Sequence, residues 1–434
     1  MAGSKIWAPR ALARRQFLAA SLLASGVGLA SCTRRTGRER RATLWFSYGG
    51  QNRLVLERLI DRFNQTSVTG RIHGVFQGDY YEAIAKLRLG IAAGEVPTIT
   101  HVIGEVVPYL VEAGVLQRLD AFPGATDIDT IEALSQRGSF VYPRDKLARQ
   151  HELYALPFNR STPIAYVNQN LFDALDVEIP STWDDLRSVA RRFAEVRPGK
   201  VRYGFGSPID WWFWLALLGQ AGGEVVDADG QITLGGKLGV EAVEFWQTLV
   251  NRDRTMKPPP GRDANAMEIT NRDFLSERIP MMWTSTAFLN YLEENAAFDV
   301  RAVALPRHRR YATPTGGTHF VMLRDTPDWQ KEIAWRFLVW MMQPDQVIEW
   351  STSTGYMPTT ATAVERLRER GFYRQHPNYL VAYDQLDVAS ALPWSQELFR
   401  VQREVIQPRL EQAVLEDLQA GDVMRRALVE ARTG

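Results

Sequence analysis

The chain reads Leu156-Pro157-Phe158-Asn159-Arg160-Ser161-Thr162-Pro163-Ile164-Ala165-Tyr166-Val167-Asn168 in its first half. The apolar run from Ile164 to Val167 is typical of a buried strand. The polar run before it, Asn159 to Pro163, has the composition of a turn. A turn is therefore one interpretation of these five residues. The other is a segment that crosses between two lobes of the fold just before the strand begins.

Upstream of this stretch, the sequence alternates between strand and helix patterns. Apolar, β-prone runs predict strands over residues 43–48, 71–76 and 98–102. Between them, apolar residues spaced by three and four positions predict helices whose buried stripes run over 56–63 and 84–91. Such alternation argues for a mostly parallel sheet that is covered on both faces.

The alternation continues downstream. A helix is expected to begin where Ser181 with Asp184, or Thr182 with Asp185, has the spacing of a capping box. Two α/β units followed by a helical tail suggest two lobes, and ligand clefts form between such lobes. Further patterns predict, in chain order, a turn over 227–230, a strand over 231–234, a helix over 330–343 that Pro344 ends, and a helix over 398–432.

The N-terminal region has the pattern of an export signal. Arg14-Arg15-Gln16-Phe17-Leu18 precedes an apolar segment over 19–30 that ends in small residues before Cys32, the only cysteine of the chain. This apolar run is shorter than the roughly 20 residues that a bilayer span needs. It resembles a bacterial lipoprotein signal, in which the cysteine is lipidated and cleavage occurs just before it, and the arginines resemble a twin-arginine signal. The alternative for Cys32 is an incidental free thiol.

The net charge of +1 hides an uneven distribution of charge along the chain. Residues 1–41 carry nine Lys/Arg and one acid. Of the totals of 51 Lys/Arg and 50 Asp/Glu, residues 42–434 therefore keep 42 basic and 49 acidic side chains, a net charge of −7. An acidic body has no general attraction to nucleic acid. We interpret residues 1–31 as the signal peptide and 32–41 as a polar tether.

Enzyme signatures are mostly missing from the sequence. It contains no His-Glu-x-x-His, no Gly-x-Ser-x-Gly and no phosphate-loop motif, and Gly204-Phe205-Gly206 lacks the third glycine of a dinucleotide fingerprint. The six histidines show no metal-ligand spacing, so we expect no metal and no cofactor. Carboxylates are abundant, which leaves a glycosidase pair open as the alternative.

Aromatic residues cluster at Trp211-Trp212-Phe213-Trp214. On a helix, Trp211 and Trp214 share a face while Trp212 points elsewhere. An indole face suits the C–H face of a sugar or a choline-like cation, so Trp211 and Trp214 are candidate ligand contacts. The alternative is a helix buried in the core.

Several motifs together resemble one family. The chain resembles the sugar-type solute-binding proteins of bacterial ABC importers (family 1) and, within them, the members that bind glycerol-3-phosphate. The resemblance spans nearly the whole body. Its anchors are Pro157-Phe158-Asn159-x-Ser161-Thr162-Pro163, Gly316-Gly317, Thr354-Gly355-Tyr356-Met357-Pro358 and Gly371-Phe372-Tyr373.

The resemblance implies an α/β, two-lobed periplasmic-binding-protein-like fold of type II. The ligand cleft lies between the lobes, which crossing segments join. We place lobe I at residues 42–163 and 318–358, and lobe II at 164–317 and 359–434.

The resemblance also implies ligand contacts at particular residues. Tyr80 would stack on a polyol or hydrogen-bond to it. Glu105, matched with one inserted residue, would accept paired hydroxyl groups because a carboxylate is an acceptor only. Ser161 matches the serine of the crossing motif, and Ser285 matches the serine of Trp283-Thr284-Ser285-Thr286.

Three further contacts follow from the same resemblance. Gly317 matches a glycine whose backbone N–H approaches the ligand closely. Tyr356 matches the tyrosine of the Thr-Gly-Tyr motif. Arg403 matches the arginine that would hold a phosphate with its planar guanidinium, and Arg400 is a rival on the same helix face.

The sequence therefore predicts a non-enzymatic, lipid-anchored solute-binding component of an ABC importer, outside the cytoplasm. The expected ligand is glycerol-3-phosphate, a glycerophosphodiester such as a choline-bearing one, or a related sugar. The expected partners are the ABC permease subunits in the membrane, with the binding protein a monomer. A secreted carbohydrate-active hydrolase with paired carboxylates is the alternative, and a purely structural surface lipoprotein is a third.

Overall fold

Two β-sheets, of five and three strands, organise the fold, and two two-stranded sheets, β11-β9 and β12-β4, lie beside them in the described residues. A computed structural model describes residues 40–47, 49–196, 203–257 and 264–433. The predicted signal peptide, Cys32 and most of the tether lie outside these residues. The strands are β1 (Arg41–Phe46), β2 (Arg71–Phe76), β3 (Ile99–Ile103), β4 (Phe140–Val141), β5 (Ala155–Ser161), β6 (Pro163–Asn168), β7 (Met281–Ser285), β8 (Val300–Val303), β9 (Thr313–Pro314), β10 (Gly316–Met322), β11 (Ala389–Ser390) and β12 (Leu392–Pro393).

Helices make up most of the remaining described chain. The first nine are α1 (Gly50–Thr66), α2 (Tyr80–Ala93), α3 (Val107–Glu112), α4 (Gln169–Leu175), α5 (Trp183–Val196), α6 (Trp211–Ala221), α7 (Lys237–Gln247), α8 (Ala264–Leu275) and α9 (Leu289–Asn295). The others are α10 (Asp328–Met341), α11 (Pro344–Thr354), α12 (Ala361–Glu369), α13 (Phe372–Gln375), α14 (Asn378–Asp384), α15 (Leu398–Arg400), α16 (Gln407–Leu415) and α17 (Ala420–Thr433). Three short turns of helix matter below: η1 (Gly104–Val106), η6 (Thr286–Phe288) and the π-helical η8 (Val401–Ile406).

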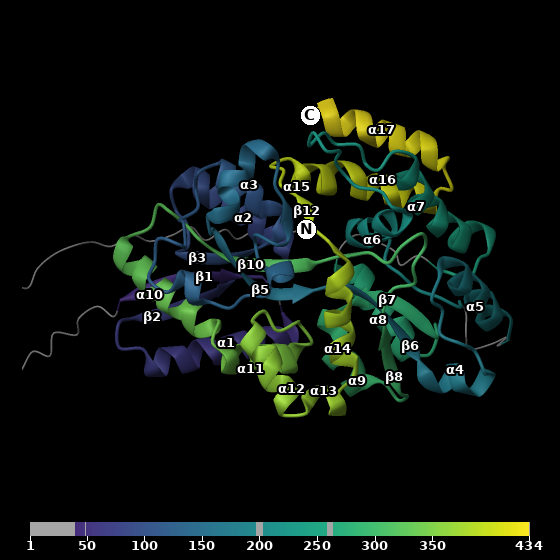
Figure 1. Cartoon of the computed structure of the whole chain (residues 1–434), viewed down its shortest axis with the longest axis horizontal. Coiled ribbons are helices and arrows are strands. Elements are labelled where there is room, and N and C mark those ends of the chain that lie inside the picture. The colour runs from purple at the N-terminus through teal and green to yellow at the C-terminus, as the bar shows by residue number, and fades with distance from the viewer. Residues whose placement is uncertain (1–39, 48, 197–202, 258–263, 434) are drawn as a thin grey trace, which may run out of the picture. The chain divides into compact units, whose positions relative to one another are not determined.

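The larger sheet has the strand order β2-β1-β3-β10-β5. Its first three strands are parallel, as the alternating pattern predicted, whereas β10 runs antiparallel to both β3 and β5. The prediction of a mostly parallel sheet is thus half right. The sheet is mixed because β10 alone runs against the other four strands, since β5 is antiparallel to β10 and so has the direction of β1, β2 and β3. In Figure 1 this sheet lies on the left, with α1 and α10 below and in front and α2 and α3 above.

The smaller sheet has the order β7-β6-β8 and is antiparallel throughout. Helices α8 and α14 pack against its edge strands. A third group of helices, α6, α7, α16 and α17, packs together, and Figure 1 shows the C-terminal α15, α16 and α17 in yellow at the top. The predicted helical tail is confirmed, but it is broken: residues 416–419 separate α16 from α17.

The turn interpretation of Asn159 to Pro163 is wrong. Strand β5 runs through Ser161 and β6 begins at Pro163, so only Thr162 separates two strands that belong to different sheets. The backbone of Thr162 is fully engaged there: its N–H donates to Thr286 Oγ1 at 3.3 Å, and its carbonyl accepts from Thr286 N–H at 3.2 Å. The segment is therefore a crossing between the sheets, and Thr315 makes a second crossing between β9 and β10.

Other local predictions have mixed outcomes. The capping box is Thr182 with Asp185, since each side chain accepts from the other's backbone N–H, at 3.1 and 3.0 Å. Pro344 does not simply end a helix: it begins α11, where its missing N–H costs nothing. The prediction of a strand over 231–234 is wrong. Only Ile232 forms a bridge, to Val226, and Leu234 has φ +48°, which is not an extended conformation.

Gly317 holds the second crossing in place. Its φ is +92°, and a Cβ built on it would lie 1.8 Å from the carbonyl oxygen of Asn159. The pairing of β10 with β5 shifts register at this point, between Gly317 and His319. The bulge therefore requires a residue without a side chain, for a reason that lies in the protein's own backbone.

We predict that Gly317→Ala lowers the free energy of unfolding by at least about 2 kcal/mol, because it combines a strained φ with a backbone clash. The control is Gly421→Ala in α17, where an added Cβ meets nothing within 4 Å. That change should be neutral or stabilising. Urea denaturation of both variants checks this, and equal stabilities would contradict the account of the bulge.

Candidate functional site

A chain of hydrogen bonds crosses the larger sheet and ends at two tyrosines. Ser47 N–H donates to His101 Nε2 at 3.1 Å, and His101 Nδ1 lies 3.0 Å from Thr318 Oγ1. Burial lowers the pKa of His101 to about 3, so the ring is neutral. Because Nε2 accepts, Nδ1 carries the hydrogen and donates to Thr318.

The direction of the remaining bonds follows from that start. Thr318 Oγ1 donates to Asn159 Oδ1, and Asn159 Nδ2 donates to Tyr80 Oη at 2.9 Å. Tyr80 Oη lies 3.3 Å from Tyr356 Oη, to which it can donate. When Tyr80 donates in this pair, the hydroxyl hydrogen of Tyr356 is available to a ligand, and this tyrosine acts as a hydrogen-bond donor.

Each residue of this chain is positioned by a local feature. Asp79 caps α2 by accepting from the N–H groups of Tyr81 and Glu82, which places Tyr80 at the first turn. Tyr356 follows Gly355, which ends α11 with φ +88°, and its ring stacks on Trp350 with centroids 5.9 Å apart. The sequence prediction named Tyr80 and Tyr356, and the structure brings them together.

Two charged residues are buried beside the tyrosines. Glu105 lies in η1, directly after β3, and burial raises the pKa of its carboxyl group, while Arg160 and the indole of Trp211 offset part of that rise. Arg160 is only 1% exposed. Its Nη2 donates to Ser139 Oγ at 3.2 Å and to Thr315 Oγ1 at 3.1 Å, and burial lowers its pKa to about 10.

The clustered tryptophans occupy different environments: Trp214 packs in the core, whereas Trp212 lies by the strand β10. Trp211 and Trp214 are both fully buried, and Trp214 Nε1 donates to the carbonyl of Gly239 at 3.3 Å, which places Trp214 in the packing against α7. Trp211 lies by Glu105. Trp212, which the sequence analysis did not select, is half-buried and lies over Gly316, where a Cβ would come within 2.5 Å of its indole.

The two predicted serines and Gly317 lie where the sheets meet. Ser161 pairs with Gly316 at the end of β5, and Ser285 pairs with Pro163 at the end of β7. Ser285 Oγ accepts from Ala287 N–H at 3.1 Å, so its hydroxyl also begins η6. Gly317 owes its place to the backbone of Asn159, as described above.

Arg403 and Arg400 point to different neighbours. The guanidinium carbon of Arg403 lies 3.7 Å from the ring centroid of Tyr81, the residue after Tyr80. Arg400 Nη2 instead donates to the carbonyl of Ala431 in α17 at 3.0 Å. Of the two rivals, Arg403 is therefore the one that contacts α2, through Tyr81.

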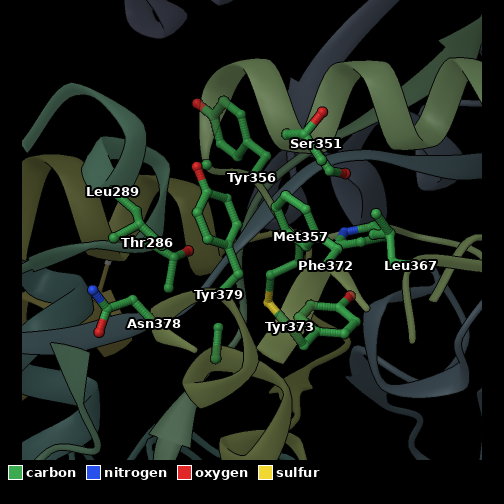
Figure 2. Close-up of a pocket in the computed structure, with 14 residues that line it drawn as sticks. Thr286, Leu289, Ser351, Tyr356, Met357, Leu367, Phe372, Tyr373, Asn378 and Tyr379 are labelled. Atoms are coloured by element: carbon green, nitrogen blue, oxygen red, sulfur yellow. The ribbon is translucent and has the colours of Figure 1, made fainter. Parts of the chain in front are cut away.

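A pocket of about 340 Å³, open solvent included, lies on another side of Tyr356. Figure 2 shows Tyr356, Tyr373 and Tyr379 around it, with Thr286 and Leu289 on one side and Ser351 and Leu367 on the other. Its lining carries no charged side chain. The pocket could therefore hold an uncharged group beside the polar residues, but it provides no ionic group itself.

No group of three His, Cys, Asp or Glu side chains in the described residues is placed to hold a metal ion. Within the same residues, no helix has both the length and the apolar character to cross a bilayer.

Comparison with known proteins gives related sequences across most of the chain. The sn-glycerol-3-phosphate-binding periplasmic protein UgpB of Yersinia pestis bv. Antiqua (strain Antiqua) is 24% identical over 391 residues, which cover 87% of this chain and 86% of the relative. The protein of the same name from Salmonella typhimurium is 25% identical over 405 residues, with coverage of 87% and 88%.

Solved structures share the fold. UgpB from Mycobacterium tuberculosis, in complex with glycerophosphocholine, has a TM-score of 0.78 at 21% identity and covers 91% of this chain and 98% of its own. Maltose-bound MalE3 of T. maritima has a TM-score of 0.77 at 17% identity, with coverage of 90% and 99%. The two-lobed α/β fold is therefore confirmed. The family model described as bacterial extracellular solute-binding protein matches residues 58–378, and the chain belongs to that family.

Proposed function

We propose that this protein captures a small phosphorylated glycerol derivative, either glycerol-3-phosphate or a glycerophosphodiester, between its lobes and presents it to ABC permease subunits. One observation carries the proposal. The Tyr80–Tyr356 hydroxyl pair is joined through Asn159 to the strand before Thr162, the buried Glu105 interacts electrostatically with Arg160 of the same strand, and Arg403 stacks on Tyr81 beside Tyr80 in the chain. The lobe boundaries 42–163 with 318–358, and 164–317 with 359–434, belong to this proposal.

The hydroxyl groups of the glycerol moiety would bind to complementary hydrogen-bond donors and acceptors. The Tyr356 hydroxyl is free to donate to the ligand when Tyr80 donates to it. The carboxylate of Glu105 accepts from paired hydroxyls, which an acceptor-only group suits. Ser161 and Ser285 line the crossing on either side of Thr162. We retain Gly317 as a residue whose backbone borders the ligand.

The remaining parts of the ligand meet Arg403 and the indoles. Arg403 supplies positive charge next to Tyr81 and would pair with the phosphate. Trp212 at Gly316, with Trp211 behind it, supplies an aromatic surface that suits a C–H face or a choline-like cation. A relative that binds glycerol-3-phosphate by name and a structural neighbour that holds glycerophosphocholine support this ligand class.

A binding role also accounts better for the acids than hydrolysis does. A glycosidase of the usual kind needs two carboxyl groups facing each other across the substrate. Within the part of the chain that the structure describes, Glu105 is the only carboxylate among the buried residues. The related proteins are binding proteins of ABC importers, which supports a protein that binds and does not catalyse.

The N-terminal sequence completes the proposal. The signal over residues 1–31 would direct export by the twin-arginine route, and lipidation of Cys32 would hold the body at the membrane beside its permease. The short tether that follows would keep a monomeric binding protein within reach of that partner.

We predict that Arg403→Ala weakens binding of glycerol-3-phosphate roughly 100-fold, because a charged contact to phosphate is lost. Binding of a neutral sugar such as maltose, if it occurs, should change little. Arg400→Ala removes the same charge three residues away and serves as the control. Isothermal titration calorimetry of the mature protein measures both. If wild-type protein binds no glycerol phosphate or glycerophosphodiester, the proposed ligand class is wrong.

We predict that Glu105→Gln raises the melting temperature of the unliganded protein at pH 8 but not at pH 4. The folded state raises the pKa of this carboxyl group, so folding favours its neutral form. That stability is present below the ordinary pKa and is lost as pH rises through the raised one. The amide stays neutral throughout, and the variant should also bind the ligand about tenfold more weakly because one acceptor oxygen is gone.

Glu112→Gln is the matched control for this pH dependence. Burial tends to raise the pKa of Glu112, but hydrogen bonds from Lys146 and Trp394 outweigh it and lower the pKa. Neutralising Glu112 should therefore destabilise the protein at pH 8, with the opposite sign. Thermal denaturation between pH 4 and pH 8 compares the two, and the same sign for both variants would refute the burial argument.

We predict that Cys32→Ser moves the protein from the membrane fraction to the supernatant of lysed cells, because serine offers no thiol for lipidation. Labelling with a clickable fatty acid should mark the wild-type protein alone. An unchanged membrane association of the serine variant would show that another segment anchors the chain.

A further inference from the structure

Arg160 is a buried cation whose hydrogen-bonding capacity is only partly used. A guanidinium has five N–H donors, and Arg160 uses those of Nη2 on two hydroxyl oxygens. Its Nε and Nη1 have no hydrogen-bond partner in the described part of the chain. No carboxylate of that part lies within ion-pair distance, 4.0 Å, of Arg160. Burying such a cation is costly unless a negative group compensates it.

The groups around Arg160 compensate its charge only in part. Ser139 and Thr315 contribute neutral hydroxyls. His319 is completely buried, and burial followed by repulsion from Arg160 lowers its pKa, so the ring brings no charge of either sign. Glu105 attracts Arg160 without an ion pair, and burial still lowers the pKa of Arg160 to about 10. An anionic ligand would supply the direct partner that the guanidinium lacks.

Arg160 also lies at the centre of the proposed site. Its backbone pairs with Gly317 on one side, and its carbonyl accepts from Met357 N–H at 2.9 Å on the other. Its guanidinium holds Thr315, the residue of the second crossing, next to the Gly316 that Trp212 covers. A ligand held by Tyr356 and Glu105 would lie beside this guanidinium.

We propose that Arg160 is an anion-binding residue of the solute site and that it receives a phosphate oxygen of the ligand. The inference rests on the proposed function and extends it. With Arg403 outside and Arg160 inside, two guanidinium groups face the ligand, which favours an organic phosphate over a neutral sugar. Arginine suits this role because its charge persists when it is buried and its planar fork matches phosphate oxygens.

The first test is Arg160→Met, which keeps an unbranched side chain similar to the aliphatic part of arginine and removes the charged guanidinium. We expect affinity for glycerol-3-phosphate to fall about 100-fold, while the melting temperature of the unliganded protein rises because a partly compensated buried charge is gone. The control is Arg432→Met, which removes a guanidinium that donates to the carbonyl of Ile232. That variant should keep the wild-type affinity within twofold.

The opposite pattern overturns the inference. If Arg160→Met melts at a lower temperature and binds glycerol-3-phosphate with unchanged affinity, Arg160 only joins Ser139 to Thr315. Should the methionine variant fail to fold, Arg160→Lys decides: it keeps the charge but loses the fork. We expect at least tenfold weaker binding from the lysine variant, and an unchanged affinity would refute the role.

Inorganic phosphate separates this inference from the proposed function. Wild-type protein should melt at a higher temperature in millimolar phosphate than in chloride of equal ionic strength, and Arg160→Met should abolish that difference. This result would support the anion subsite even if no glycerol phosphate binds, in which case only the proposed ligand fails. An equal response of wild type and Arg160→Met to phosphate would exclude the subsite.

Discussion

The backbone crossing at Thr162 is the constraint on which the rest of the structure depends, together with the close contact between Gly317 and Asn159 just before it. A single residue joins β5 of one sheet to β6 of the other, and the backbone of Thr162 bonds to Thr286 in both directions. Gly317 brings a second strand so close to Asn159 that no side chain fits between them. The two lobes are therefore joined through strands whose register leaves little freedom at the joint.

The same crossing concentrates polar groups in a place where most of the structure is apolar. Strands β5 and β10 carry Asn159, Arg160, Thr318 and His319, all buried. Since successive side chains of a strand point to opposite faces, Asn159 and Thr318 join the hydrogen-bond chain to Tyr80, whereas Arg160 turns toward Ser139 and Thr315. The proposed binding site lies at this crossing because β5 and β10 bring buried donors, acceptors and a charge together there.

Much of the fold was predictable from local patterns. Strands β1, β2 and β3 and the helices between them follow the apolar periodicity of the sequence, which reports burial directly. The Thr182 capping box was also readable, because its spacing is local. The predictions that failed concern partners distant in sequence. Asn159 to Pro163 has turn composition, yet pairing with β10 and β7 makes it two strands.

The residues of the candidate site also fall into those that local motifs predicted and those that only the structure revealed. Motifs singled out Tyr80, Tyr356 and Arg403, and the structure brings Tyr80 to Tyr356 and Arg403 to Tyr81. Helical geometry correctly separated Trp212 from Trp211 and Trp214, but it could not tell which face meets the crossing. Arg160 was not predicted as a site residue, because it occupies the variable position of the motif Pro157-Phe158-Asn159-x-Ser161-Thr162-Pro163. An indication was available, since it is the one charged residue between Leu156 and Asn168.

By itself, the sequence determined the alternation of strands and helices and the family. These properties depend on periodicity and on short motifs, which act locally. Only the tertiary structure decided that Trp212 covers Gly316, that the hydroxyls of Tyr80 and Tyr356 meet and that Arg160 is buried with two of its nitrogens unsatisfied. The physical reason is that burial and hydrogen-bond partners depend on chain segments more than one hundred residues apart, which no local pattern encodes.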